Sequence, residues 1–250
     1  MKKKIFLIIS IFYISNFLFS APDGVKPMKF NFSFGGILGG FDKNSAQRGL
    51  QVYTEICASC HGLKHLAYRN LEEIGYNKSQ INNIAKQFLV NDLPDEDGEI
   101  KKRNAIYSDN FVDPYPNDEA AKAANNGAYP PDLTLIVKAR KDGANYLRSL
   151  LLGYEDSPEG FDVGEGYYNK YMPGKIIAMP QPLYGEDVEY QDGTVPSLEQ
   201  EVLDVVTFLT WTSMPELEKR KSTGIKVIIF LIIMTFFFFL SYRKIWKDVK

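Results

Sequence analysis

The sequence predicts a mainly α-helical domain with long loops, attached to a single C-terminal transmembrane helix. Three observations support this prediction. Apolar residues repeat with helical spacing in two segments, strand patterns are scarce between those segments, and a long apolar run lies near the C-terminus. The chain has 250 residues, of which 45% are hydrophobic and 24% charged, as is ordinary for a folded protein. We therefore expect one sizeable domain with appended segments.

The first segment, residues 1–21, has the pattern of a secretory signal peptide. Three lysines precede an apolar run from Ile5 to Phe19, and the small residues Ser20 and Ala21 follow the run. An uncleaved anchor helix is the alternative, but about fifteen apolar residues are few for crossing a bilayer. Cleavage after Ser20 or after Ala21 would leave residues 22–218 as an exported, periplasmic domain.

The first helix of this domain is predicted over residues 44–56. Ser45 is a possible N-terminal cap, and Leu50, Tyr53 and Ile56 are spaced to share one face. The predicted helix ends directly before the two cysteines of the chain.

These cysteines belong to the run Cys57-Ala58-Ser59-Cys60-His61, which is the attachment motif for c-type haem. At this spacing each thiol can add to one of the two vinyl groups on a porphyrin edge, and the next residue can direct its imidazole at the iron. We expect one covalently attached haem c, with Cys57 and Cys60 as anchors and His61 as an iron ligand.

A structural disulfide, a thiol redox pair and half of a zinc site explain less of this pattern. A zinc site needs four ligands, whereas the chain has two cysteines and two histidines. The second histidine, His65, lies one turn beyond His61 on a predicted helix, and we interpret it as a surface residue. A redox pair needs no adjacent histidine, and it usually lies in a βαβ pattern that is not found here.

A methionine sulfur is the usual second axial ligand in haem electron carriers, where it raises the potential. Outside the signal peptide, the polar leader and the apolar run, three methionines remain: Met172, Met179 and Met214. Prolines stiffen the segment around Met179, whereas Met214 follows a predicted helix and is expected to pack. The residues alone favour Met179 and leave Met172 open.

A second helix is predicted over residues 197–211. Ser197 and Gln200 are a possible capping box, and the apolar stripe of this helix comprises Leu198, Val202, Val205, Val206 and Leu209. Packed against the helix at residues 44–56, it would form the frame of a class I cytochrome c-like haem domain. Turn-forming residues between the two helices predict long loop insertions.

The apolar run from Ile225 to Tyr242 is predicted to be the transmembrane helix of an anchor that covers residues 219–250. It would span about 27 Å, which is close to the hydrocarbon thickness of a bilayer. A buried core helix is the alternative, but the residues from Phe236 to Phe239 make the run apolar on every face. Lysines and arginines balance on its two sides, so the signal peptide decides the orientation. We expect a single-pass protein of the bacterial inner membrane with a short cytoplasmic tail.

Charge is distributed unevenly along the chain. The formal total is −2, but the three initial lysines contribute +3 and residues 219–250 contribute +7, which leaves −12 on residues 5–218. An acidic body disfavours nucleic acid and favours basic partners, although acidity can also serve solubility alone. Candidate docking segments for a basic carrier are the acidic runs 92–99, 155–165 and 186–192. The sequence contains no nucleotide-binding glycine loop and no nucleophile with a plausible base. Hydrolase or transferase chemistry is therefore unsupported.

Taken together, several runs of the chain resemble the cytochrome c1 family over nearly the entire mature length. They are residues 48–53 before the cysteines, 67–69 after them, 123–128 followed by 130–133, 171–174 and 178–180, with the tail helix behind them. The order and spacing of these runs carry the resemblance.

The resemblance implies His61 as fifth iron ligand and Met179, rather than Met172, as sixth. It also implies that residues Asn125 to Pro131 line the haem pocket and that Arg140 pairs with a haem propionate. The alternative for Arg140 is an ordinary surface arginine in a basic run. A paired propionate would avoid an uncompensated buried charge.

The function implied is that of a non-catalytic electron-transfer subunit of a quinol:cytochrome c reductase. The haem would take electrons from a Rieske iron–sulfur protein, beside a cytochrome b subunit and membrane lipid, and pass them to a soluble or tethered cytochrome c. Two alternatives remain: a c-type haem subunit of a terminal oxidase, and a membrane-anchored thiol–disulfide oxidoreductase that uses Cys57 and Cys60.

Overall fold

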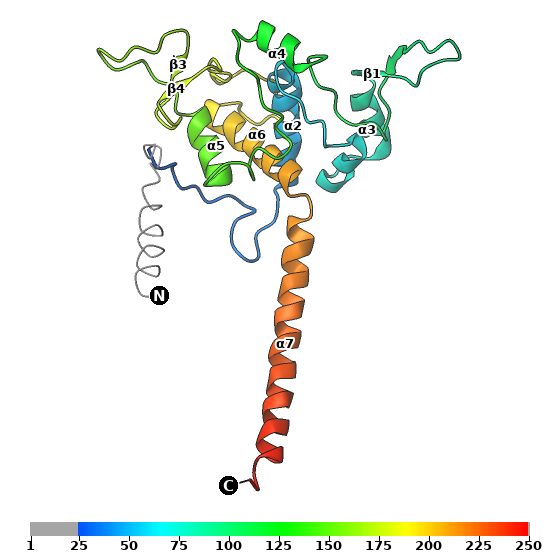
Figure 1. Cartoon of the computed structure of the whole chain (residues 1–250), viewed down its shortest axis with the longest axis vertical. Coiled ribbons are helices and arrows are strands. Elements are labelled where there is room, and N and C mark those ends of the chain that lie inside the picture. The colour runs from blue at the N-terminus through cyan, green and yellow to red at the C-terminus, as the bar shows by residue number, and fades with distance from the viewer. Residues whose placement is uncertain (1–24, 250) are drawn as a thin grey trace, which may run out of the picture.

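The structure is a computed structural model that describes residues 25–249, so the predicted signal peptide lies outside the described residues. The described chain is mainly helical, as predicted, and consists of a loop-rich domain at one end of a long helix (Figure 1). Its α-helices are α2 (Lys43–Glu55), α3 (Lys78–Ala85), α4 (Asp118–Ala124), α5 (Gly143–Leu151), α6 (Leu198–Ser213) and α7 (Leu217–Ile245). Two 3₁₀ segments, η1 (Cys57–Ser59) and η2 (Tyr68–Ile74), follow α2.

Strands are short and confined to two antiparallel pairs. β1 (Leu89–Asn91) pairs with β2 (Lys102–Asn104), and β3 (Tyr167–Tyr168) pairs with β4 (Ile176–Ile177). Each pair closes one of the long insertions rather than forming part of a larger sheet. The prediction of long loops between the two main helices is therefore confirmed.

Helix α2 begins one residue earlier than predicted, and its cap is different. The Asp42 carboxylate accepts hydrogen bonds from the backbone N–H groups of Asn44 and Ser45 at 3.0 and 3.2 Å. Ser45 is buried instead, and its hydroxyl donates to Asp204 of α6 at 2.6 Å. The prediction of Ser45 as the cap was wrong because tertiary contact with α6 recruits its side chain.

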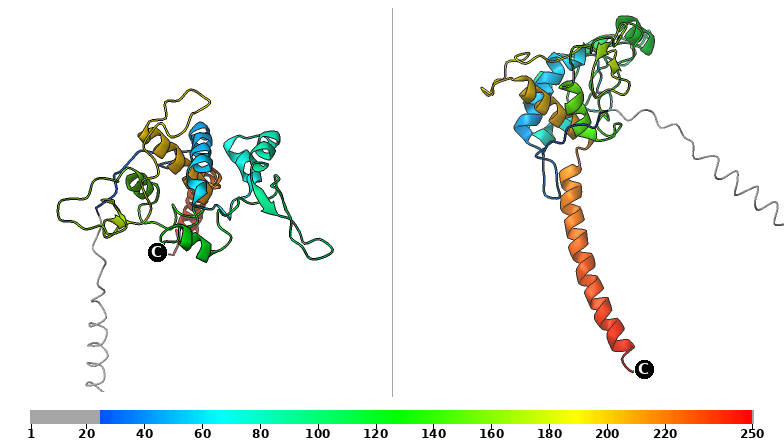
Figure 2. Two further views of the ribbon diagram at one scale, coloured as in Figure 1. Left: turned by 90° about the horizontal axis from the view of Figure 1, so that it is seen from above. Right: turned by 90° about the vertical axis from the view of Figure 1, so that its left-hand side faces the viewer.

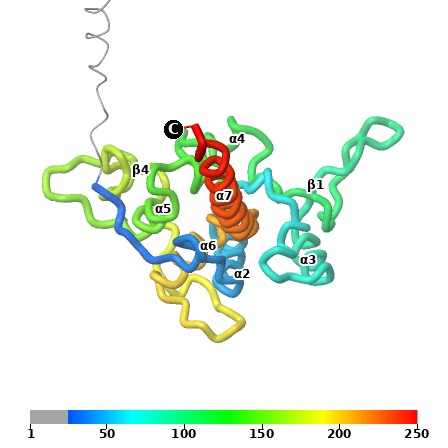
Figure 3. Tube along the Cα trace, turned by 90° about the horizontal axis from the view of Figure 1, so that it is seen from below, coloured from blue at the N-terminus to red at the C-terminus, as the bar shows by residue number. Residues whose placement is uncertain are grey.

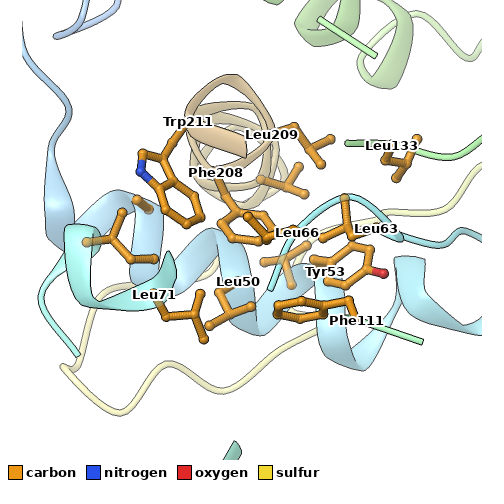
Figure 4. Close-up of a cluster of buried hydrophobic side chains, with 14 of the residues drawn as sticks. Leu50, Tyr53, Leu63, Leu66, Leu71, Phe111, Leu133, Phe208, Leu209 and Trp211 are labelled. Atoms are coloured by element: carbon orange, nitrogen blue, oxygen red, sulfur yellow. The ribbon is translucent and has the colours of Figure 1, made fainter. Parts of the chain in front are cut away.

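The core forms where α2 crosses α6. Figure 4 shows Phe208, Leu209 and Trp211 of α6 packed against Leu50 and Tyr53 of α2. The two helices approach closely at Gly49, where a Cβ atom would overlap the backbone of Asp204. Glycine is therefore required for this crossing.

A cluster of polar side chains links α2 and α6 at the edge of their crossing. Arg48 of α2 donates to the fully buried Asp204 at 2.8 Å and to the more exposed Asp192 at 2.8 Å. Gln200, one turn before Asp204, donates to the same carboxylate at 3.0 Å. Burial opposes the charge of Arg48, but its hydrogen bonds to Asp204 and Asp192 outweigh burial and raise its pKa. The buried carboxylate is thus fully compensated.

Helix α6 extends two residues beyond the predicted end, and Ser197 caps it as expected, accepting from the Gln200 N–H at 3.3 Å. The Gln200 side chain, however, bonds Asp204 instead of reaching back to complete a capping box. Most of α6 is buried, so it is the central helix of the domain. Met214 follows α6 and packs against the core, as predicted.

Helix α7 carries the predicted membrane segment and extends beyond it at both ends. Its 29 residues include an apolar stretch long enough to cross a bilayer, and that stretch is exposed on all sides. Figures 1 and 2 show α7 projecting away from the domain with nothing packed along most of its length. The arrangement is that of a single-pass membrane anchor.

Candidate functional site

The two cysteines lie at the end of α2, on a single tight turn. The backbone N–H groups of Cys60 and His61 both donate to the Cys57 carbonyl, at 3.1 and 2.9 Å. This turn brings the two thiols and the imidazole into one short stretch directly beyond the α2–α6 crossing. Both cysteines are free thiols, so no disulfide consumes them.

The His61 ring is oriented by a backbone carbonyl. Its Nδ1 lies 2.8 Å from the Pro131 oxygen, which can only accept, so Nδ1 carries the proton and Nε2 keeps its lone pair. Burial lowers the pKa of His61, although the Pro131 carbonyl acts in the opposite direction. A neutral imidazole with a free Nε2 is the form that binds a metal ion.

The carbonyl that orients His61 is itself held by the segment that follows it. The Leu133 N–H donates to the Gly62 carbonyl at 2.9 Å, and the Lys64 N–H donates to the Asp132 carboxylate at 2.9 Å. Ser213 at the end of α6 donates to the Thr134 carbonyl at 2.9 Å. The predicted pocket residue Pro131 is therefore fixed against both the cysteine turn and the central helix.

Asn125 reaches the site through a tyrosine that sequence reasoning missed. Its side-chain amide donates to the Tyr115 hydroxyl at 3.1 Å and to the Ala121 carbonyl at 2.7 Å. The Tyr115 hydroxyl in turn lies 3.9 Å from the Cys60 sulfur. Tyr115 lies in a loop 55 residues from Cys60, and no motif in the sequence marks it.

The two candidate methionines differ in what holds them. The Met172 sulfur accepts a hydrogen bond from the Tyr146 hydroxyl at 3.6 Å. Met179, two residues after β4, is held through its backbone, since the Tyr154 hydroxyl donates to its carbonyl at 3.0 Å. The hydrogen bond to Met172 engages the sulfur that an iron ligand would need, whereas the bond to Met179 fixes its main chain.

Arg140 is exposed, and its guanidinium donates to the carbonyl of the preceding Ala139 at 3.2 Å. Within residues 25–249 it forms no ion pair with a carboxylate of the chain. Burial raises the pKa of Tyr146, and the Arg140 charge acts against that rise.

His65 is exposed, as expected of a surface residue, but it lies in a turn and not on the predicted helix. Among the described residues no group of three or more cysteine, histidine or acidic side chains is placed to hold a metal ion, so the structure lends no support to a zinc site. Burial raises the pKa of the Cys57 thiol to about 12, whereas a redox-active thiol has a lowered pKa. This chemistry disfavours the thiol–disulfide alternative.

The donor set fits a covalent haem. Two free thiols precede an imidazole with an available Nε2, and Cys57 and Ala58 pack against the main apolar cluster. A porphyrin attached here would lie against apolar side chains, which limits the access of water.

The three acidic runs lie on different sides of the domain. In Figure 3 the β1–β2 hairpin, the loop before β3 and the loop before α6 extend in three directions. The loop before α6 borders a wide-open hollow of about 660 Å³, and His61 is not among the residues that line it. The three runs therefore do not form one continuous docking surface.

The sequence of the chain is similar to one protein family and to several characterised proteins. Residues 32–249 match the model of the Cytochrome C1 family. The chain is 41% identical over 244 residues to cytochrome c1 of Rhodospirillum rubrum, covering 91% of this chain and 90% of that protein. It is 43% identical over 233 residues to mitochondrial cytochrome c1-2 of Solanum tuberosum, covering 92% of this chain and 89% of that protein. It is also 42% identical over 246 residues to cytochrome b/c1 of Bradyrhizobium diazoefficiens, covering 89% of this chain but only 36% of that longer protein.

Proposed function

The chain belongs to the cytochrome c1 family, and from this premise we propose that it is the haem subunit through which a quinol:cytochrome c reductase passes electrons. Bound haem c supplies a one-electron ferric–ferrous couple at this site. The single observation that carries the proposal is the His61 ring, whose Nδ1–H is fixed by the Pro131 carbonyl while Nε2 stays available beside two free thiols.

Each residue of the site has a distinct part in the proposal. Cys57 and Cys60 would form the thioether bonds to the haem, and His61 and Met179 would hold its iron. The Pro131 carbonyl sets the tautomer and ring plane of His61, which raises the basicity of the ligating nitrogen. The free guanidinium of Arg140 supports a pairing with a haem propionate, since no carboxylate of the described chain occupies it.

We also place the domain on the periplasmic side of the bacterial inner membrane. The signal-peptide pattern of residues 1–21 would export the body, and α7 would stop the transfer. The cysteine turn lies at the end of α2 that is remote from α7 (Figure 1), and thirteen helical residues give about 20 Å of separation. Redox partners would therefore approach the haem from the aqueous side.

The partners we propose are cytochrome b, the Rieske iron–sulfur protein as electron donor, and a soluble or tethered cytochrome c as acceptor. Because the acidic runs point in three directions, one carrier can meet only part of them. A docking role for any run requires that the association rate of a basic cytochrome c fall steeply with added salt. A rate that is insensitive to salt would rule the acidic runs out.

The haem and its ligands can be tested together. A pyridine haemochrome spectrum and the mass of the mature polypeptide should both show one covalent haem in the wild type and none in a Cys57→Ala, Cys60→Ala variant. His61→Ala should lose the low-spin spectrum, whereas the matched control His65→Ala should keep it because His65 is exposed.

The methionines provide a second matched pair. Met179→Leu should lower the midpoint potential by roughly 100 mV, a fraction of the range that axial ligands span. Met172→Leu should leave the potential nearly unchanged. An unchanged titration of Met179→Leu would reject that ligand. Co-purification with cytochrome b and a Rieske protein, rather than with an oxygen-reducing centre, distinguishes the reductase from a terminal oxidase.

A further inference from the structure

A short apolar loop next to the anchor has no part in the haem site. Residues 33–40 read Ser-Phe-Gly-Gly-Ile-Leu-Gly-Gly. At the tip of this loop the exposed fractions of Ile37 and Leu38 are 77% and 87%. Figures 1 and 2 show the loop in dark blue, descending from the domain beside the first turns of α7. Exposing two large aliphatic side chains to water is unfavourable in free energy, so an apolar environment that covers them would stabilise the protein.

The neck of the loop is closed and rigid. Gly39 packs so tightly on the backbone of Gly35 that a Cβ atom would overlap the Gly35 carbonyl. Above the neck, the Phe34 ring is buried and lies 4.8 Å from Phe32 and 5.2 Å from Phe41, measured between ring centroids. The tip is therefore presented by a fixed support and not by a loose strand of chain.

Two residues of α7, one turn apart, hold this neck. The Glu218 carboxylate accepts from the Phe41 N–H at 2.7 Å. The Lys221 ammonium donates to the carbonyls of Phe34 and Gly39 at 2.7 and 2.9 Å, one on each side of the neck. From Phe41 to Gly39 the loop therefore follows α7 toward its apolar segment, and the tip lies further along the same path.

The depth of the tip follows from the helix geometry. Lys221 precedes Ile225, the first residue of the apolar segment, by four positions, which is about 6 Å along the axis. The headgroup region on each side of a bilayer is of similar thickness. Lys221 consequently lies at headgroup depth when α7 spans the membrane, and the tip beyond the neck reaches the boundary with the hydrocarbon.

We propose that Ile37 and Leu38 insert into the lipid interface beside α7 and form a second contact between the domain and the bilayer. The tip is continuous with the membrane-spanning surface of α7, which favours lipid over a water-soluble protein partner. With one contact through α7 and another through the loop, the domain cannot rotate freely about its anchor. The cysteine turn, where the haem would be attached, then keeps a fixed orientation relative to the membrane.

The test uses a single introduced thiol, because haem attachment consumes both native cysteines. Leu38→Cys in the haem-loaded full chain is labelled with bimane and reconstituted into phosphatidylcholine–phosphatidylglycerol vesicles. The matched control is Leu93→Cys, which is 83% exposed on the β1–β2 hairpin, remote from α7. Neither side chain packs in the core, so neither substitution should disturb folding.

The label at Leu38 should lose most of its fluorescence to a phosphatidylcholine that carries a shallow doxyl group, and iodide in the water should quench it little. The label at Leu93 should show the opposite response. Iodide quenching at both positions would overturn the proposal, as would resistance to both quenchers at Leu38, since that pattern means a protein covers the tip. Labelling of more than one thiol per chain would instead show that haem attachment had failed. The experiment therefore distinguishes a failure of the proposed haem attachment from a failure of the proposed lipid contact.

Discussion

The two sides of the haem site are built by different means. The attachment side, with Cys57 and His61, continues directly from a helix that is buried against α6. The methionine side comes from a loop that follows a two-residue strand, and a hydrogen bond from the Tyr154 hydroxyl to the Met179 carbonyl supports it. One side depends on apolar packing across the core, whereas the other depends on single polar contacts.

This difference separates the free energy of folding from the tuning of the iron. Burial of a large apolar side chain contributes about 1.5–3 kcal/mol, whereas a net hydrogen bond contributes about 1 kcal/mol. Changes at the α2–α6 crossing should therefore unfold the domain. Changes around Met179 should alter the redox potential while the fold persists.

The largest effect is expected for Arg48→Met. This change leaves Asp204 buried with no positive partner, since Ser45 and Gln200 supply only neutral donors. Breaking a buried ion pair costs about 3–5 kcal/mol, and chemical denaturation followed by helical circular dichroism should measure it. Asp192→Asn removes the exposed partner of the same arginine and should cost under about 1 kcal/mol. Equal losses from both variants would show that the crossing does not depend on the buried carboxylate.

Gly49→Ala should destabilise the same crossing by about 3 kcal/mol, because the added methyl group meets the backbone of Asp204 and forces the helices apart. Gly224→Ala is the matched control. That helical glycine has open space around it, and alanine should leave stability unchanged or slightly raised. The free energy of unfolding of the two variants distinguishes close packing from a general effect of removing glycine.

Glu201 joins the core to the loop before α6, and it should make stability depend on pH. Burial raises its pKa from 4.5 to about 7, while its Oε1 accepts from the backbone N–H groups of Asp187 and Val188 at 2.8 and 3.2 Å. The folded protein therefore binds a proton more tightly than the unfolded chain. The contribution of Glu201 to stability is fully present below pH 4.5 and falls by about 3 kcal/mol as the pH rises to 7.

Glu201→Gln keeps an acceptor for both N–H groups but removes the titration. Its free energy of unfolding should lack the decline between pH 4.5 and 7 that the wild type shows. Denaturation curves at a series of pH values provide the measurement. A wild-type decline that persists in the variant would assign it to other groups.

The sequence carries stronger signals for the attachment side than for the rest of the site. Cysteine spacing and helical periodicity are local signals, so Cys57, His61 and the two core helices could be identified directly. The ring orientation of His61 could not, because Pro131 lies 70 residues away and only the folded chain brings its carbonyl to Nδ1. Ser45 was assigned as a cap for the same reason: its partner Asp204 is 159 residues distant.

On the methionine side the residues alone favoured Met179 but left Met172 open, and the family resemblance then implied Met179. The hydroxyl groups that distinguish the two methionines belong to Tyr146 and Tyr154, which have no motif around them. A hydrogen bond across a loop depends on where distant segments meet. Periodicity carries no information about such contacts.

The smallest effect, and the sharpest separation of the two sides, is expected for Tyr154→Phe. Burial raises the pKa of Tyr154, so its hydroxyl stays protonated and donates to the Met179 carbonyl. Loss of this bond costs about 1 kcal/mol, which corresponds to a decrease of about 40 mV in midpoint potential if it acts on the ligation of ferrous iron. Tyr146→Phe removes the comparable hydroxyl at Met172 and should leave the potential unchanged. Redox titration and the methionine–iron charge-transfer absorption provide the measurement. Because a general loosening of the loop would affect both variants alike, only a shift confined to Tyr154→Phe supports a hydrogen bond that positions the sixth ligand.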